Sequence, residues 1–404
     1  MAKAAVPNYL GQDFSTASPG MRFGMYLKLW EGEAWSKSKD KPLDRAKHLN
    51  DNDQRTVKAL LTRQKQSFEM LDASTRFQLE ACATAPFTTG LGNEHPLENG
   101  FAFLNPYGLP YLPGSGVKGV LRQAARELAS GEWGGKHGWN DAPCYSLELG
   151  RDRIPLSVID VLFGKESQDG DKEHVRGALS FWDVIPQIQG DSLMVEIMTP
   201  HQSHYYQQNP AAGSTTPHDS GQPNPISFLT VPPGSSFTFH VVCDLMHLRR
   251  LTADRLEGAP DLLAEGDTHW KKLLEAAFEH AFAWLGFGAK TAVGYGAMES
   301  ETMRQASKQA ATGREQKRKA DAQRQEAARE QAEAEPWPGA RLKFNRANKA
   351  LTAEKNGKSA IALAPKGEEL LASLPDDIRK KVEANQFVKA TAFVVKNTLV
   401  RVEP

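Results

Sequence analysis

Apolar positions follow two different periods along the middle of the chain. Between residues 76 and 85 every second position is apolar, which is typical of a half-buried strand. Over 117–128 and 269–286 apolar residues recur every three or four positions, as in helices that bury one face. Together with shorter apolar runs, these patterns predict strands at 76–85, 177–185, 192–198, 227–229, 236–242 and 292–298, and helices at 117–128 and 269–286.

In outline, the predicted elements follow the order strand, helix, strand, strand, helix, strand. This order is the ferredoxin-like (RRM-like) βαββαβ plan of the α+β class. We therefore expect one such domain at 76–300, with long insertions at 130–175 and 199–226. The second insertion is polar and rich in proline, and an insertion of this length is either a functional projection or disordered.

The pattern changes on both sides of this domain. Residues 1–75 combine an extended arm that carries scattered apolar anchors with a charged, helix-favouring segment. Residues 301–335 interleave charges of both signs with alanine and glutamine, which predicts a solvated helical linker. In 336–404 three predicted strands surround a helix, which indicates a small β-rich, OB-like domain.

Composition narrows the possible functions. The 49 Lys and Arg residues balance 49 Asp and Glu residues, so any contact with nucleic acid depends on local basic patches. Cys82, Cys144 and Cys243 lie far apart without a C-x-x-C pair, so the sequence supports neither a zinc ribbon nor a disulfide framework. The chain has no long apolar run and no leader-like start, so we expect a cytoplasmic protein without membrane segments or cofactors.

A glycine-rich turn at 114–116 leads directly into the first predicted helix. Ser115 is the expected N-cap of that helix, and the free N–H groups of a helix N-terminus suit a phosphate. Lys118, Arg122 and Arg126 follow at four-residue spacing and form a cationic stripe. The pattern favours anion binding, although an ordinary solvated basic face would look the same.

A second glycine-rich turn, GFGAKTAVGYG at 286–296, carries Lys290. Neither turn is a Walker A loop, because that loop requires Gly-Lys-Ser/Thr and Ala289 precedes Lys290 here. Neither turn fits a dinucleotide-binding fingerprint. The sequence therefore disfavours nucleotide hydrolysis and leaves two lysine-bearing turns that suit the backbone of a nucleic acid.

Five stretches occur in an order that resembles the RAMP superfamily of CRISPR proteins: GLGNEHPLENG, GLPYLPGSGVKGVLR, GALSFWDVIP, MTPHQSHYY and GFGAKTAVGYG. The resemblance covers about residues 77–299. The family turn P-G-S-x-x-K-G-x-L-R is matched by Pro113, Gly114, Ser115, Lys118, Gly119, Leu121 and Arg122. Gly116 stands where the family usually has a second serine or threonine. The resemblance implies the same βαββαβ fold.

The resemblance also implies a role in a type III-B (Cmr) ribonucleoprotein of antiviral defence. The partners would be the CRISPR guide RNA, the target RNA and other Cmr subunits: the repeated backbone RAMP, a small helical subunit and another RAMP cap. The chain would be a non-catalytic cap near the 3′ end of the guide. The implied RNA-binding residues are Gly114, Ser115, Lys118, Arg122, Gly286, Gly288, Lys290, Thr291 and Tyr295, with His95, His201 and Tyr205 as further contacts.

Two other functions stay open. Some members of this superfamily are metal-independent endoribonucleases that process CRISPR RNA, and such chemistry needs a general base and a proton donor. The available groups are His95, His201, His204, Tyr205, Lys118 and Lys290, but no spacing groups them. The histidines at 201, 204 and 218 lack the helix, cysteines or paired carboxylates of a metal site, so none is expected. The basic turns could also bind acidic loops of partner proteins.

Overall fold

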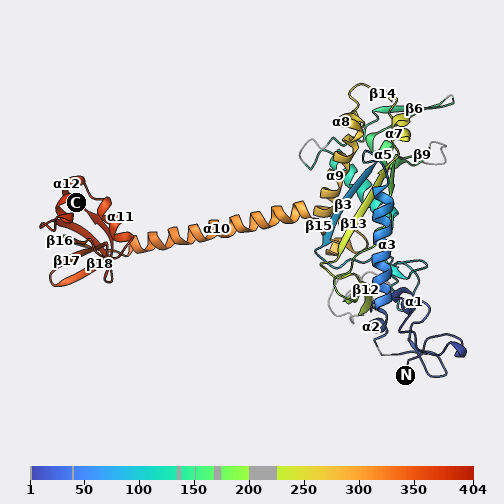
Figure 1. Cartoon of the computed structure of the whole chain (residues 1–404), viewed down its shortest axis with the longest axis horizontal. Coiled ribbons are helices and arrows are strands. Elements are labelled where there is room, and N and C mark those ends of the chain that lie inside the picture. The colour runs from blue at the N-terminus through green and yellow to red at the C-terminus, as the bar shows by residue number, and fades with distance from the viewer. Residues whose placement is uncertain (1, 39–40, 134–137, 151, 168–173, 200–224) are drawn as a thin grey trace, which may run out of the picture. The chain divides into compact units, whose positions relative to one another are not determined.

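The computed structural model describes residues 2–38, 41–133, 138–150, 152–167, 174–199 and 225–404 (Figure 1). The chain divides into two compact units, Met1–Arg304 and Gln305–Pro404. None of the helices in the described residues combines the length and hydropathy that a membrane crossing needs.

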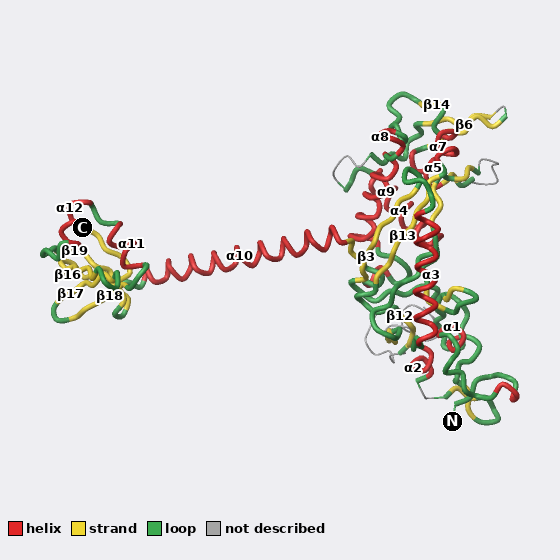
Figure 2. The backbone as a smooth tube through the Cα atoms, viewed as in Figure 1, coloured by secondary structure: helices red, strands yellow, loops and turns green. Residues whose placement is uncertain are grey.

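The first unit is built on a four-stranded antiparallel sheet (Figure 2). Its strands lie in the order β10 (Leu179–Phe181), β13 (Ser236–Cys243), β3 (Arg76–Ala83), β15 (Met298–Ser300). The predictions for β3 and β13 are confirmed. The last strand was expected at 292–298 but begins at Met298, because Thr291–Val293 forms a 3-10 turn instead.

Helices α4 (Gly114–Ala129) and α9 (His269–His280) pack on each other and on this sheet. The apolar stripe predicted for α4 is confirmed, since Val117, Leu121, Ala124, Ala125 and Leu128 are buried. A turn of π-helix, η3 (Ala281–Leu285), follows α9 and ends at Gly286. Aromatic rings from β13, α9 and the 286–296 turn join the core: Phe239, Phe278, Phe282 and Phe287.

The N-terminal residues belong to the same unit. Here the chain forms η1 (Asn8–Leu10), α1 (Pro19–Phe23), β1 (Trp30–Glu31), β2 (Ser36–Lys37), α2 (Pro42–Ala46) and α3 (Asp51–Glu69). Phe23 and Leu43 are buried in the main core, so the apolar anchors of the expected arm pack on the chain itself. The α3 helix begins with a capping box between Asn50 and Asp53.

The segments between the main elements carry short pieces of regular structure. They are β4 (Phe103–Leu104), β5 (Leu109–Pro110), β6 (Tyr145–Leu149), β7 (Asp152–Leu156), α5 (Val158–Phe163), β8 (Gly164–Lys165), β9 (Val175–Arg176), β11 (Met194–Met198), β12 (Ile226–Thr230), α7 (Leu245–Leu251), β14 (Asp254–Arg255) and α8 (Ala264–Asp267). The insertion expected at 130–175 contains β6, which pairs with β7 and β14. Strand β11 pairs with β12 and lies outside the four-stranded sheet.

The second unit contains most of α10 (Glu301–Ala332) and a closed five-stranded barrel with its own core. The barrel runs in the order β16-β17-β18-β20-β19 and closes through β16 and β19. Its strands are β16 (Glu335–Asn345), β17 (Ala350–Lys355), β18 (Lys358–Ala362), β19 (Lys389–Val395) and β20 (Thr398–Glu403). Helices α11 (Lys366–Ala372) and α12 (Asp376–Glu383) lie between β18 and β19 in the chain. The predicted small β-rich domain is confirmed.

Candidate nucleic-acid interface

The N-terminus of α4 differs from the prediction made for it. Ser115 is not the N-cap, because the helix begins at Gly114 after Pro113 and no side chain caps it. The Gly114 N–H donates a hydrogen bond to Asp183 Oδ1 at 2.8 Å. A Cβ at position 114 would lie 2.2 Å from the carbonyl oxygen of Phe181. Gly114 therefore allows close packing, and a carboxylate of the chain itself already occupies this helix end.

The basic residues further along α4 line a pocket of about 260 Å³ between this helix and the α5–β9 region. Lys118 and Arg122 form one side of it, and Lys165 and Arg176 belong to the other. Among the described residues, Glu166 is the one carboxylate in the lining, beside these four cations. We call this the basic pocket.

Arg122 is a largely buried cation of the basic pocket. Its Nη1 bonds Glu166 Oε1 at 2.6 Å, with the Arg122 side chain 12% exposed and Glu166 78% exposed. The Arg122 Nε is buried and has no hydrogen-bond partner among the described residues. A buried donor without a partner is costly, so an incoming anionic oxygen would gain from meeting it. Glu166 stands in water and can move aside at little cost.

The glycines of the 286–296 turn mainly serve to pack it. Gly288 has a φ of +89°, and a Cβ there would lie 2.3 Å from the Thr88 carbonyl oxygen. Gly296 has a φ of +70°, and a Cβ there would lie 1.8 Å from the Phe287 carbonyl oxygen. The turn is held by Ala289 N–H, which donates to Thr88 O at 2.8 Å. These positions require glycine for close backbone contact.

Lys290 and Tyr295 of this turn rest on the β11–β12 hairpin. Lys290 Nζ lies 3.1 Å from Met198 Sδ and 5.4 Å from the centroid of the Phe228 ring. The Tyr295 hydroxyl donates to Glu196 Oε2 at 3.5 Å, and burial and the nearby carboxylate raise the pKa of Tyr295. Thr291 is half-buried beside them. Within the described chain, Lys290 has no carboxylate partner.

The two lysine-bearing turns do not converge on one pocket. The lining of the basic pocket includes no described residue of the 286–296 turn. Within the first unit, Figure 1 shows α5 and β9 toward the top of the view and β12 toward the bottom. Among the described residues the two turns therefore do not share this pocket, and a single strand of RNA would have to run along the unit to reach both.

The ring face and both ring nitrogens of His95 contact other residues of the chain. Its ring stacks on Phe23 with centroids 3.9 Å apart. Nδ1 accepts a hydrogen bond from the Leu97 N–H at 3.2 Å, so Nε2 carries the proton and donates to the Phe23 carbonyl oxygen at 3.0 Å. Burial lowers the pKa of this imidazole. Both ring nitrogens of His95 already have hydrogen-bond partners. In this arrangement neither can act as the general base that an endoribonuclease needs to deprotonate a 2′-hydroxyl. His201, His204 and Tyr205 lie outside the described residues.

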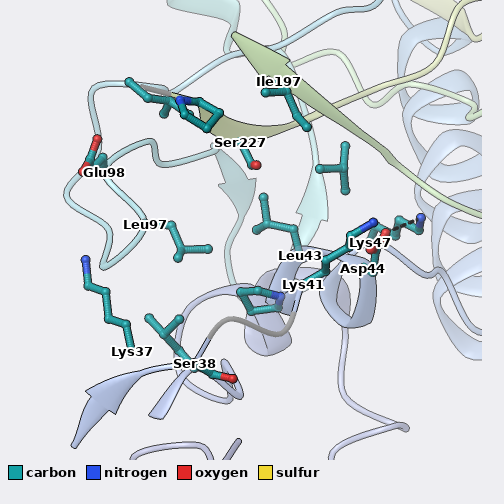
Figure 3. A pocket seen from close by; sticks show the side chains of 15 residues that line it. Lys37, Ser38, Lys41, Leu43, Asp44, Lys47, Leu97, Glu98, Ile197 and Ser227 are labelled. Atoms are coloured by element: carbon teal, nitrogen blue, oxygen red, sulfur yellow. Dashed lines mark hydrogen bonds and ion pairs between the residues drawn. The ribbon is translucent and has the colours of Figure 1, made fainter. Parts of the chain in front are cut away.

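Figure 3 shows another pocket, of about 520 Å³, between the N-terminal segment and the β11–β12 hairpin. Leu43, Leu97 and Ile197 surround it. Lysines stand at its edge, but Lys47 is paired with Asp44 at 2.7 Å. Apolar and charged side chains line this pocket together, and no sequence motif had marked it.

Lys165 and Arg176 were missed by the sequence analysis. Lys165 directly follows Gly164, and Arg176 directly precedes Gly177. The two glycines are in close contact, because a Cβ at Gly177 would lie 2.5 Å from the Gly164 nitrogen. Two glycines that flank a polar insertion were the available signal for this close approach. Among the described residues, no group of His, Cys, Asp and Glu side chains is arranged to bind a metal ion.

The model of the RAMP superfamily matches residues 83–299, more than half of the chain. The chain belongs to the RAMP superfamily. A Pyrococcus furiosus protein described as CRISPR system Cmr subunit Cmr6 is 27% identical over 247 residues. That alignment covers 51% of this chain and 63% of the Cmr6 chain, so the match spans less than two thirds of the relative. The predicted family is confirmed.

Solved structures give weaker similarities to this RAMP protein. A subunit of the type III-B Cmr-beta complex bound to cognate target RNA is 20% identical, with a TM-score of 0.36 and coverage of 62% of this chain and 66% of that one. The crystal structure of Pyrococcus furiosus Cmr6 is 24% identical, with a TM-score of 0.26 and coverage of 56% and 97%. A chain of a type IV-B CRISPR complex is 14% identical, with a TM-score of 0.32 and coverage of 56% and 89%.

Proposed function

We propose that this RAMP protein is a non-catalytic, RNA-binding subunit of a type III-B CRISPR ribonucleoprotein, with the role of a sixth Cmr subunit. The observation that carries the proposal is the 27% identity to Cmr6 over 247 residues. The basic pocket lies within residues 83–299, which the RAMP superfamily model matches. In that role the chain caps the backbone of the complex near the 3′ end of the guide RNA. Its partners are the guide and target RNAs, the repeated backbone RAMP, the small helical subunit and another RAMP cap.

The basic pocket supports the RNA-binding part of this proposal. A phosphate that enters between Lys118, Arg122, Lys165 and Arg176 replaces Glu166 as the partner of Arg122 and meets the free Nε. Gly119 on the exposed side of the same helix has no atom within 4 Å of its would-be Cβ, so a sugar-phosphate backbone can approach there. Lys290 offers a second, separate contact further along the unit.

The arrangement of elements supports the finer fold assignment. In chain order β3, α4, β10, β13, α9 and β15 form the sheet and its two helices, and the sheet order places the third strand beside the first. We assign this part as a ferredoxin-like unit with insertions. We assign the barrel as OB-type, since its fifth strand β20 lies between β18 and β19 and runs parallel to β18.

Co-purification tests this function. The chain is expressed together with the products of its neighbouring genes, and the short RNA that accompanies the complex is sequenced. We expect a CRISPR guide RNA, and we expect Lys118→Ala combined with Arg122→Ala to reduce its yield. Arg126→Ala is the matched control, because Arg126 is an exposed cation on the same helix and does not line the pocket. Equal guide yields from all three proteins would reject the proposal.

The non-catalytic part has its own test. Purified protein is incubated with labelled precursor RNA in the presence of a chelator, and we expect the RNA to stay intact. Metal-independent cleavage that disappears in His95→Ala would instead establish the endoribonuclease alternative. The contacts of His95 predict that this substitution lowers stability, by about 1–3 kcal/mol for the lost hydrogen bonds and ring stacking.

A further inference from the structure

The C-terminal barrel is the basic part of an otherwise balanced chain. Residues 335–404 contain 13 Lys and Arg against 8 Asp and Glu, whereas residues 1–334 contain 36 and 41. The match to the RAMP superfamily ends at residue 299, so the family assignment does not describe the barrel. A local excess of positive charge of this kind attracts polyanions.

One aromatic ring stands open on this barrel. The Phe387 side chain is 62% exposed and precedes β19, where residues alternate between the two sides of the wall. Val388 and Ala390 point into the barrel core, so Phe387 and Lys389 face outward. Exposing a phenylalanine to water gains no stability for the fold, and an aromatic ring beside cations is the combination on which proteins stack single-stranded nucleic acids.

Two cations flank the Phe387 ring. The Arg341 guanidinium carbon lies 5.3 Å from the ring centroid and the Lys389 Nζ lies 5.9 Å from it. Arg341 on β16 pairs directly with Lys389 on β19, which sets both side chains beside the ring. Within the described residues, neither cation has a carboxylate partner. Both charges are therefore available to an incoming anion.

A nearby ring shows the opposite arrangement. Phe393 lies across from Arg401 in the β19–β20 ladder, and the guanidinium carbon is 3.9 Å from the ring centroid. Arg401 Nη2 is also within 3.3 Å of Glu403 Oε1. Here the arginine covers the ring and is itself paired, whereas at Phe387 both cations stand further from the centroid. Of these two rings, Phe387 is the one open for stacking.

We propose that the surface formed by Arg341, Phe387 and Lys389 binds single-stranded RNA. An unpaired base stacks on the Phe387 ring, and the adjoining phosphates meet Arg341 and Lys389. The bases of a duplex are already stacked and cannot use this ring. Because stacking on a phenylalanine reads no base edge, the surface accepts any sequence. This site is separate from the basic pocket and does not depend on the proposed function.

The test uses the full chain carrying Lys118→Ala, Arg122→Ala and Lys290→Ala, so that residual binding reports on the barrel. The probe is a fluorescent oligouridine of about twelve nucleotides, within the span that such surfaces cover. We expect measurable binding and a loss of about tenfold or more in affinity in Phe387→Ala, because one stacked base is worth that much. Phe387→Tyr should retain binding, since it keeps a ring. Arg341→Ala with Lys389→Ala should weaken binding and flatten its salt dependence.

Ile361→Ala is the matched control. Ile361 is also an exposed apolar residue of the barrel, 42% exposed, but it lies on β18. The proposal is overturned if Phe387→Ala binds RNA like its parent, or if Ile361→Ala loses as much affinity. It is also overturned if a polyglutamate peptide displaces RNA equally well, which would point to an acidic protein partner. None of these results bears on the basic pocket, because Lys118 and Arg122 are already replaced in the parent protein.

Discussion

Arg122 and Glu166 meet at 2.6 Å across the mouth of the basic pocket, one side chain nearly buried and the other almost fully in water. The pair holds the guanidinium in place while leaving its Nε without a partner. In the proposed complex with RNA, an anionic oxygen of the ligand would take the place of Glu166 beside Arg122. We therefore expect that a substitution of Glu166 changes the affinity of the basic pocket for an anionic ligand.

Removing the Glu166 carboxylate is expected to strengthen RNA binding. Glu166→Gln frees Arg122 from a competing anion, and an exposed ion pair contributes at most about 1 kcal/mol, so the gain is at most about fivefold. Equilibrium titration with labelled single-stranded RNA measures it. Glu148→Gln provides the control, because Glu148 pairs with Arg153 at 2.8 Å on the surface and does not line the pocket. A weaker affinity in Glu166→Gln would contradict this account.

Lys118 and Arg122 are expected to change the salt dependence of RNA binding. Each phosphate contact on single-stranded RNA contributes about 0.7 to the slope of log affinity against log salt concentration. Lys118→Ala and Arg122→Ala should each lower the magnitude of that slope, and Arg126→Ala should leave it unchanged. The slope is read from titrations at several salt concentrations. If the slope is the same in the wild-type protein and in all three variants, the pocket does not contact phosphate.

Two glycines of α4 are expected to respond in opposite directions to alanine. Gly119 lies in the helix with open space around its would-be Cβ, so Gly119→Ala should stabilise the protein by up to about 1 kcal/mol. Gly114→Ala should destabilise it by about 1–3 kcal/mol, because the new Cβ would meet the Phe181 carbonyl oxygen at 2.2 Å. Thermal unfolding measures both. A stable Gly114→Ala protein would show that the α4 N-terminus can move away from β10.

His240 is expected to make the first unit less stable in acid. It is buried against Phe68 and Trp182, neither ring nitrogen has a hydrogen-bond partner in the described residues, and burial lowers its pKa from 6.5. Below pH 6.5 the unfolded chain binds the proton that the folded chain excludes. Stability is therefore full above that pH and decreases as the pH falls toward the folded-state pKa.

The measurement is chemical unfolding at pH 7.5 and 5.5, followed by tryptophan fluorescence. Each unit of pKa depression costs about 1.4 kcal/mol once the pH lies below both values. His240→Phe should reduce the difference between the two pH values, because an apolar ring suits the contacts with Phe68 and Trp182. Some pH dependence should remain from His95, whose pKa is lowered in the same direction. An unchanged difference in His240→Phe would exclude this residue as the cause.

The sequence by itself determined the elements whose apolar period is long and regular. The alternation at 76–85 and 236–242 predicted β3 and β13, and the three-to-four spacing predicted the buried stripe of α4. Positions such as Phe237 and Phe239 face the core because side chains alternate along any strand. The order of the motifs was also sufficient to indicate the RAMP superfamily, which the family comparison confirms.

Only the tertiary structure decided what surrounds each candidate residue. Lys165 and Arg176 join Lys118 and Arg122 because α5 and β9 pack beside α4, and no local pattern records such a long-range contact. The same applies to Asp183 at the α4 N-terminus and to Phe23 against His95. Periodicity reports which face of an element is buried. The charge and shape of a site depend on which distant segments share that surface, and this is set by packing.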